Sequence, residues 1–217
     1  MYACSTNFTY NGASGYTGLD SFSYQVTDIY GGNVTGNVSI TVDALPEING
    51  TTTNDTLYGT ANAERINGLE GKDHIYGKDG DDVIYGIQIA NPDDEIYAGA
   101  GDDVLYGDDG LDTLYGESGA DTFGFRSATA FNDVDVIKDF SITDGDSINI
   151  ADVLSGYDPL ADAISDFISI TDNGTDSTLM IDADGGADSF VSIALIEGVT
   201  GLSDVDSLEN TGTLITV

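Results

Sequence analysis

The chain has 217 residues and a formal net charge of −34 at pH 7, because 39 acidic side chains stand against 5 basic ones. A field of this sign excludes binding to nucleic acid or to an anionic membrane surface, and it attracts cations. The single cysteine, Cys4, excludes an intrachain disulfide, and no apolar run reaches the roughly 18 residues that a transmembrane segment requires.

The first 45 residues have the pattern of β-strands. Apolar and polar side chains alternate around Phe22 and Tyr24, and a second alternating stretch around Val38 follows the turn Gly31-Gly32. Alternation on both sides of a glycine turn predicts a β-hairpin. The amino-acid sequence of residues 15–28 resembles the last strands of the immunoglobulin-like or cadherin-like repeats of bacterial surface adhesins. The resemblance implies that residues 1–45 are part of such an extender β-domain, because a complete sandwich needs about 100 residues.

Between residues 50 and 125 a nine-residue pattern occurs eight times, and the fifth copy is three residues longer. Such self-similarity indicates a repeat architecture. The eighth position is apolar in every copy, as Leu57, Ile66, Ile75, Ile84, Ile96, Leu105, Leu114 and Phe123. The sixth position is acidic in every copy, as Asp55, Glu64, Asp73, Asp82, Asp94, Asp103, Asp112 and Asp121. Because only the middle residue of a three-residue strand points inward, the eighth positions predict the core of a narrow solenoid.

The acidic positions predict a requirement for a divalent cation. Two copies make one coil, so acidic residues 18 apart, such as Asp55 and Asp73, stack on one edge. Stacked strands lie about 4.8 Å apart, and two bare carboxylates at that separation repel by roughly 3 kcal/mol at an effective dielectric constant of about 20. A calcium ion between the carboxylates turns this repulsion into attraction, since it binds carboxylate oxygens and the carbonyl oxygens that glycine turns leave free. Without calcium we expect a disordered acidic tract.

The repeat resembles the calcium-binding nonapeptide of the repeats-in-toxin (RTX) family, whose template is G-G-x-G-x-D-x-U-x. The resemblance implies a parallel β-roll that binds several calcium ions through the sixth-position residues, and also through Asp79 and Asp109. The first two copies depart from the template, because Thr53 and Asn62 replace the fourth glycine and Glu64 replaces Asp. We therefore expect fewer ions at that end of the roll. In the longer fifth copy, Pro92 predicts a bulging turn.

After residue 125 the nonapeptide gives way to longer β-type segments. Strands are predicted at residues 134–140, 147–150, 167–171, 177–182, 189–196 and 213–217. A short helix is predicted at residues 159–165, with Asp158 as its N-cap. We expect residues 126–217 to cap the open end of the roll that residues 46–125 form, because exposed strand edges need a cover. The predicted fold class of the whole chain is all-β.

Segments of this cap, among them residues 135–140 (DVIKDF) and 182–186 (DADGG), resemble the C-terminal target domain of type I secreted proteins. The likeness is greatest for giant RTX adhesins, a group that includes ice-binding bacterial adhesins. It implies export through an ATP-driven ABC transporter and an outer-membrane channel, directed by an uncleaved signal near residues 202–217. It also implies a secreted or cell-surface location and a role in cell adhesion and biofilm formation. No N-terminal signal peptide is expected, because residues 1–12 have neither a basic region nor an apolar core.

The sequence does not favour catalysis. His74 is the only histidine, so neither an H-E-x-x-H motif nor a Ser-His-Asp triad can be assembled, and we expect no enzymatic activity. The alternative function is ligand or glycan binding by ninth-position tyrosines that we expect to stack on the outer faces, namely Tyr58, Tyr76, Tyr85, Tyr97, Tyr106 and Tyr115. Stacked aromatic side chains also stabilise a sheet by themselves, so both roles stay open.

Overall fold

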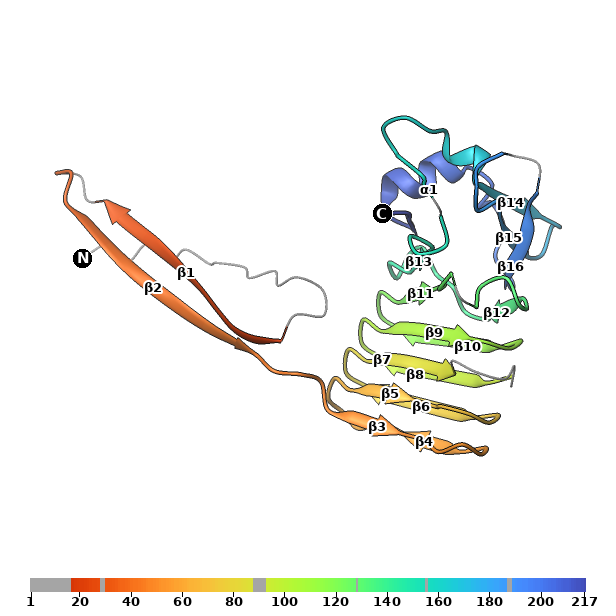
Figure 1. The fold of residues 1–217 in the computed structure, drawn as a ribbon, viewed down its shortest axis with the longest axis horizontal. Coiled ribbons are helices and arrows are strands. Elements are labelled where there is room, and N and C mark those ends of the chain that lie inside the picture. The colour runs from red at the N-terminus through yellow and green to blue at the C-terminus, as the bar shows by residue number, and fades with distance from the viewer. Residues whose placement is uncertain (1–16, 28–29, 88–92, 128, 155, 187–188) are drawn as a thin grey trace. The chain divides into compact units, whose positions relative to one another are not determined.

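A computed structural model describes residues 17–27, 30–87, 93–127, 129–154, 156–186 and 189–217. The chain divides into two compact units, Met1–Leu45 and Pro46–Val217 (Figure 1). In the first unit, β1 (Gly18–Thr27) and β2 (Asn33–Val42) pair antiparallel, with Phe22 opposite Val38, and this confirms the predicted hairpin. The bulging turn predicted at Pro92 lies outside the described residues.

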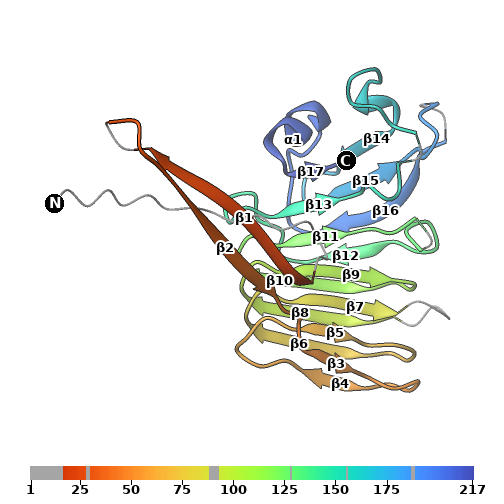
Figure 2. The ribbon, with the colours of Figure 1, turned by 60° about the vertical axis from the view of Figure 1, so that its left-hand side comes forward.

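The second unit is built on a β-roll in which the chain alternates between two parallel sheets (Figures 1 and 2). One sheet contains β3 (Glu47–Asn49), β5 (Arg65–Asn67), β7 (Val83–Ile87), β9 (Val104–Asp108), β11 (Thr122–Gly124), β13 (Ser147–Asn149) and β17 (Leu214–Ile215). The facing sheet contains β4 (Thr56–Tyr58), β6 (His74–Asp79), β8 (Glu95–Ala100), β10 (Thr113–Ser118) and β12 (Asp135–Ile137). Within the roll each strand pairs with the strand two places along the chain, so two successive repeats make one coil.

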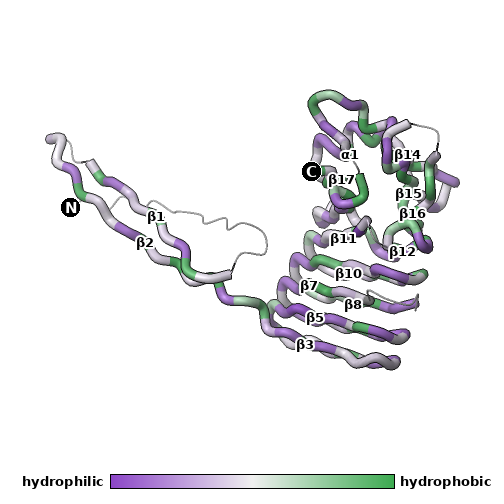
Figure 3. The backbone as a smooth tube through the Cα atoms, viewed as in Figure 1, coloured by the Kyte–Doolittle hydropathy of each residue, from purple (hydrophilic) through white to green (hydrophobic). Residues whose placement is uncertain are grey.

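The core of the roll is the predicted apolar ladder. Side chains at the eighth position are 0–1% exposed from the second repeat to the eighth, as Ile66, Ile75, Ile84, Ile96, Leu105, Leu114 and Phe123. The strand register places Ile84 between Ile66 and Leu105 on one sheet. Figure 3 shows the hydrophobic segments of the roll as short stretches within the strands, with hydrophilic residues around them. The fold class predicted from the repeat is therefore confirmed.

Coil stacking continues after the nonapeptide ends. β12 pairs parallel with β10, which places Ile137 next to Leu114. β13 pairs parallel with β11, which places Ile148 next to Phe123. Both new core residues are at most 2% exposed, so two further half-coils extend the ladder into the segment predicted as a cap.

The remaining strands of residues 126–217 extend the facing sheet beyond β12. β16 (Val191–Ile196) runs parallel to β12, and β15 (Ser177–Ile181) and β14 (Ile168–Asp172) follow antiparallel at the edge of the sheet. All of these strands lie in or beside the predicted segments. No helix of the described residues is long and apolar enough to cross a membrane.

The helix predicted at residues 159–165 is wrong. Asp158 does cap a turn, since its Oδ1 accepts the Leu160 N–H at 2.9 Å. Ala163 then adopts an extended backbone (φ −86°, ψ 125°), so only a 3-10 turn, η1 (Ile164–Asp166), follows. A helix that was not predicted, α1 (Val205–Thr211), begins after Asp204, whose side chain accepts the Ser207 N–H, and ends before Gly212 at φ 78°.

The predicted tyrosine stacks are present on the outer faces. Tyr58, Tyr76, Tyr97 and Tyr115 form one stack with ring centroids 5.2, 5.2 and 4.4 Å apart. Tyr85 and Tyr106 form a second stack on the other sheet, with centroids 5.0 Å apart. Such offset pairs stabilise the sheets beyond the area that they bury.

Candidate metal centre

The sixth-position carboxylates form two columns, one along each edge of the roll. The first column contains Asp55, Asp73, Asp94, Asp112 and Asp135, and the second contains Glu64, Asp82, Asp103, Asp121 and Asp146. From the second member on, one oxygen of each carboxylate accepts the backbone N–H of the member one coil earlier, at 2.7–3.1 Å. The carboxylates therefore face the turns of the roll and hold successive turns together.

The second oxygen of these carboxylates is different. The Oδ2 atoms of Asp73, Asp82, Asp94, Asp103 and Asp112 are buried and have no hydrogen-bond partner among the described residues. Buried polar atoms are normally paired, and a buried charge without compensation is strongly destabilising. Five such atoms in two regular columns indicate that a ligand is part of the folded state.

Glycines at the first position of the repeat keep space open beside these oxygens. A Cβ added to Gly77 would lie 2.6 Å from Asp82 Oδ2 and 2.3 Å from the carbonyl oxygen of Ala98 on the next coil. A Cβ added to Gly86 would lie 2.7 Å from Asp94 Oδ2 and 2.3 Å from the carbonyl oxygen of Gly107. Carboxylate and carbonyl oxygens thus face one small space that a side chain would fill, and oxygen-only donor sets of this kind suit calcium.

Burial raises the pKa of the column carboxylates, to about 6 for Asp82, to about 7 for Asp94, Asp103, Asp121 and Asp135, and to about 9 for Asp112. The backbone N–H that each carboxylate accepts lowers its pKa, and nearby carboxylates raise it. The ionised columns are therefore unfavourable by themselves. A divalent cation between the carboxylates would favour the ionised form instead.

Asp55 and Glu64, the first two predicted ligands, lie in the columns, but their carboxylates accept hydrogen bonds from residues of their own turns. Asp55 Oδ2 accepts the Thr51 N–H at 2.6 Å and the Thr51 hydroxyl at 2.8 Å. Glu64 accepts the Thr60 N–H at 2.9 Å and also the Thr60 hydroxyl. Binding of fewer ions at this end of the roll stays a prediction.

Asp79 and Asp109, the two other predicted ligands, lie outside the columns. Asp79 is exposed at the end of β6, and Asp109 accepts a hydrogen bond from the Asn132 amide. A calcium role for these two side chains stays a prediction. In the part of the chain that the structure describes, no three His, Cys, Asp or Glu side chains form a metal-binding cluster, so an ion in the columns would need carbonyl ligands as well.

Two column members were missed by the sequence reasoning. Asp135 and Asp146 continue the columns beyond the last nonapeptide and are 6% and 5% exposed. Asp135 and Asp146 each begin a triplet of Asp, any residue and Ile. This triplet matches the sixth to eighth positions of the nonapeptide. That triplet was the signal that could have found them.

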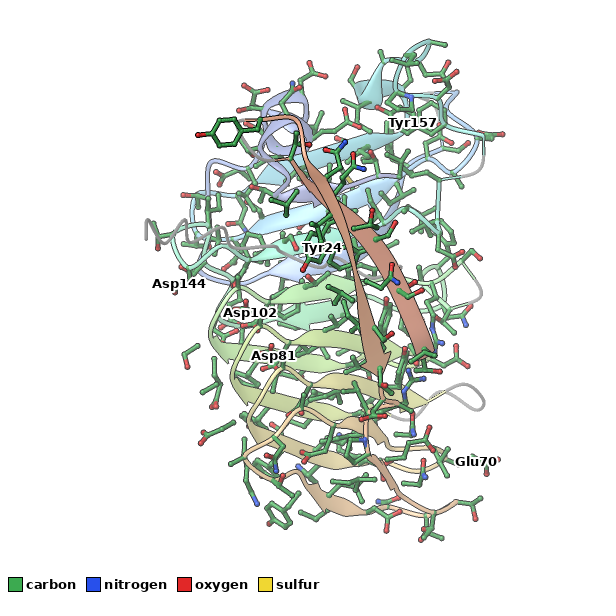
Figure 4. The ribbon with its side chains drawn as sticks, turned by 90° about the vertical axis from the view of Figure 1, so that its left-hand side faces the viewer. Tyr24, Glu70, Asp81, Asp102, Asp144 and Tyr157 are labelled. Atoms are coloured by element: carbon green, nitrogen blue, oxygen red, sulfur yellow. The ribbon has the colours of Figure 1, made fainter. Side chains whose placement is uncertain are left out.

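An outer ladder accompanies the second column. Asp81 Oδ1 accepts the Asp102 N–H at 3.1 Å, and Asp102 Oδ1 accepts the Ala120 N–H at 2.9 Å. Figure 4 shows Asp81 and Asp102 along the same edge of the roll. These exposed carboxylates add to the negative field at the mouths of the turns, which attracts cations.

Comparisons with protein families identify the repeat. The RTX calcium-binding nonapeptide repeat family matches residues 47–71, 58–86 and 93–123, and a bacterial Ig domain family matches residues 2–41. No curated protein matches the chain. The chain thus carries RTX repeats that form a calcium-binding β-roll, after a segment that matches a bacterial Ig domain.

Two solution structures are similar to this chain, the R3 and R2 subunits of the mannuronan C5-epimerase AlgE6 from Azotobacter vinelandii, each at 24% identity. The R3 subunit has a TM-score of 0.38, with 77% of this chain and 81% of that chain covered. The R2 subunit has a TM-score of 0.36, with 78% of this chain and 91% of that chain covered.

Proposed function

We propose that this calcium-binding β-roll is the C-terminal part of a large, type I secreted surface adhesin that leaves the cell unfolded and folds on extracellular calcium. The proposed function is non-enzymatic. The observation that carries it is the set of five buried column carboxylates whose Oδ2 atoms have no hydrogen-bond partner among the described residues. These atoms make the folded state dependent on a cation that is scarce inside cells and abundant outside them.

The energy available from calcium is large enough for such a switch. Extracellular calcium modules have dissociation constants on the order of 10⁻⁴–10⁻³ M. At a tenfold excess of calcium over that constant, each site contributes about 1.4 kcal/mol. Four or five sites then contribute roughly 6–7 kcal/mol, which is comparable with the net stability of a small domain, about 5–15 kcal/mol.

The proposed secretion signal, residues 202–217, is part of the folded roll. The Ile148 N–H donates to the Thr213 carbonyl at 2.8 Å, and the Ile150 N–H donates to the Ile215 carbonyl at 2.9 Å. Leu202 and Leu214 are 1% and 2% exposed. A transporter could therefore read this segment only before the roll folds. This supports the proposal that recognition inside the cell and folding outside it exclude each other.

Export by cells that carry a type I transporter tests the proposal. Deletion of residues 202–217 should keep the chain inside the cell, whereas deletion of residues 1–45, a separate compact unit, should leave export unchanged. Leu214→Asn separates the two roles of the segment, because it weakens the buried contact while keeping the signal, and it should still be exported. Normal secretion of the chain without residues 202–217 would place the signal elsewhere.

A further inference from the structure

The outward column of ninth-position side chains on the seven-stranded sheet is interrupted at Gly124 on β11. Asn149 on β13 lies next to this glycine in the strand register, and Tyr106 comes from β9 on the other side. The Tyr106 ring covers the glycine so closely that an added Cβ would lie 2.3 Å from its Cε1 atom. The Tyr106 ring thus occupies the space of the missing side chain.

A shallow pocket of about 530 Å³ lies beside this ring, lined by Tyr106, Phe125, Arg126, Asn149, Ala151 and Asp152. All six residues belong to the unit that contains the roll and its cap. The volume lies within the range of about 300–1,000 Å³ that is usual for small-molecule sites. Its lining combines aromatic surface with a few polar groups, which is the usual composition of such sites.

Arg126 forms a fixed wall of the pocket. Its Nε donates to Asp108 Oδ1 at 2.6 Å, and its guanidinium forms an ion pair with the same carboxylate, whose side chain is 1% exposed. The guanidinium also lies 5.2 Å from the ring centroid of Tyr85 and 5.5 Å from that of Tyr106. Because Asp108 already compensates its charge, Arg126 contributes shape and orientation to the pocket more than a free positive charge.

Two polar side chains are oriented before any ligand binds. Asn149 Oδ1 accepts the Ala151 N–H at 3.1 Å, which leaves the carboxamide nitrogen as a donor toward a ligand. Asp152 Oδ2 accepts the Ser127 N–H at 2.9 Å, which leaves Oδ1 as an acceptor. The pocket thus presents a donor and an acceptor beside an aromatic ring, and groups fixed in advance lose little entropy on binding.

We propose that this pocket binds a neutral saccharide, with the sugar ring against Tyr106 and its hydroxyl groups on Asn149 and Asp152. A sugar ring has an apolar C–H face for the aromatic ring and hydroxyl groups that both donate and accept. The net charge of −34 and the Asp152 carboxylate disfavour an anionic ligand. A purely apolar ligand would desolvate Asp152 Oδ1 without offering it a hydrogen-bond donor. The proposal goes beyond the export function, because it needs only the folded roll and cap.

Titration of the calcium-loaded full chain with maltose, lactose and mannobiose, followed by NMR, tests the site. Backbone amide signals of residues 124–127 and 149–152 should shift with at least one of these neutral disaccharides. Asp152→Ala and Asn149→Ala should each weaken binding about tenfold, as expected for the loss of one well-oriented hydrogen bond to a ligand. If Asp152→Ala raises the calcium concentration needed for folding, its effect on saccharide binding is measured with Asp152→Asn instead, because the carboxamide keeps the shape of the side chain.

Tyr58→Ala is the matched control, because it removes the most exposed ring of the four-ring stack on the facing sheet, and it should leave saccharide binding unchanged. Three results would each overturn the proposal. They are the absence of shifts with all three disaccharides, an equal loss of binding in Tyr58→Ala, and tighter binding of a disaccharide of uronic acids.

Discussion

The first two turns of the roll and the turns in its middle carry the acidic residue at the same position of the repeat but pair its carboxylate differently. In the first two turns the residue after the opening glycine donates its N–H to the acidic side chain of the same turn. Thr51 donates to Asp55 at 2.6 Å, and Thr60 donates to Glu64 at 2.9 Å. These carboxylates are satisfied within the protein.

In the third turn the equivalent N–H points elsewhere. Leu69 adopts a positive φ of 77° and donates its N–H to the carbonyl of Gly86 on the next coil, at 3.0 Å. Asp73 Oδ2 is then buried with no partner among the described residues. Lys78, in the fourth turn, has a φ of 85°, and Asp82 Oδ2 is likewise unpaired.

The difference follows from the fourth position of the repeat. Gly71 and Gly80 occupy it in the third and fourth turns, with φ of 123° and 114°, values that side chains rarely allow. Thr53 and Asn62 occupy it in the first two turns and have no positive φ. In these four turns a glycine at the fourth position accompanies a carboxylate oxygen without a partner, and a side chain there accompanies a carboxylate that its own turn satisfies.

The largest expected effect is that of pH on the calcium-free chain. Burial raises the folded-state pKa of Asp82 to about 6 and those of Asp94 and Asp103 to about 7, above the ordinary value of 3.8. Protonation therefore stabilises the fold, and this stability is complete below about pH 4 and is lost as pH rises through 6 and 7. In excess chelator, circular dichroism should show more β-structure at about pH 5 than at about pH 8. The opposite order would contradict the burial of bare carboxylates in the middle turns.

Removal of single carboxylates should separate the two kinds of turn. Asp82→Ala deletes a carboxylate whose Oδ2 is unpaired, and the loss of one site costs about 1.4 kcal/mol at a tenfold calcium excess. Asp55→Ala is the matched control, because Thr51 already satisfies that carboxylate. The calcium midpoint of folding should rise several-fold for the first variant and much less for the second. Equal midpoints would show that the two kinds of turn bind calcium alike.

Exchange of residues at the fourth position tests the cause of the difference. In Gly80→Ala, the new Cβ would lie 2.3 Å from the backbone carbon of Asn62, at a φ of 114°. We expect a loss of about 1–3 kcal/mol in thermal unfolding with calcium in excess. Thr53→Gly changes an exposed residue of the first turn and should cost less. A larger loss in Thr53→Gly would mean that the fourth position does not control the middle turns.

The smallest expected effect concerns Ala98, which takes the place of the first glycine in the sixth repeat and is fully buried. At the same position of the seventh repeat, a Cβ on Gly107 would lie 2.5 Å from Asp112 Oδ2. The Ala98 methyl group should narrow the equivalent space beside Asp103. Ala98→Gly should therefore lower the calcium midpoint slightly, by isothermal titration, and a raised midpoint would show that the methyl group supports the site.

The sequence predicted the roll well because its rules are local and periodic. The apolar residue at every eighth position, such as Ile84, must point inward, and the coil length places Asp94 over Asp73. The carboxylate columns followed from the same period. The sequence alone did not show that one oxygen of a column carboxylate accepts a backbone N–H while the other lacks a partner. This difference depends on whether one backbone N–H of the turn points at the carboxylate.

The cap was less predictable because its pairings are distant. Asp135 and Asp146 join the columns across separations of 23 and 25 residues, where the nonapeptide pattern uses 18. A search for a fixed period misses them. The helix α1 was not predicted, although Asp204 and Gly212 are ordinary cap residues, because its seven residues bury only Val205 and so give no apolar periodicity.

A calcium titration of the full chain, followed by circular dichroism and hydrodynamic radius, tests the central claim most directly. At neutral pH in excess chelator, the chain should be expanded and should lack the β-type spectrum of the roll. Added calcium should restore both signals together, and magnesium at the same concentration should not, because it demands a more rigid octahedral site. A compact chain with an unchanged β-type spectrum in excess chelator would contradict the claim that calcium completes the turns.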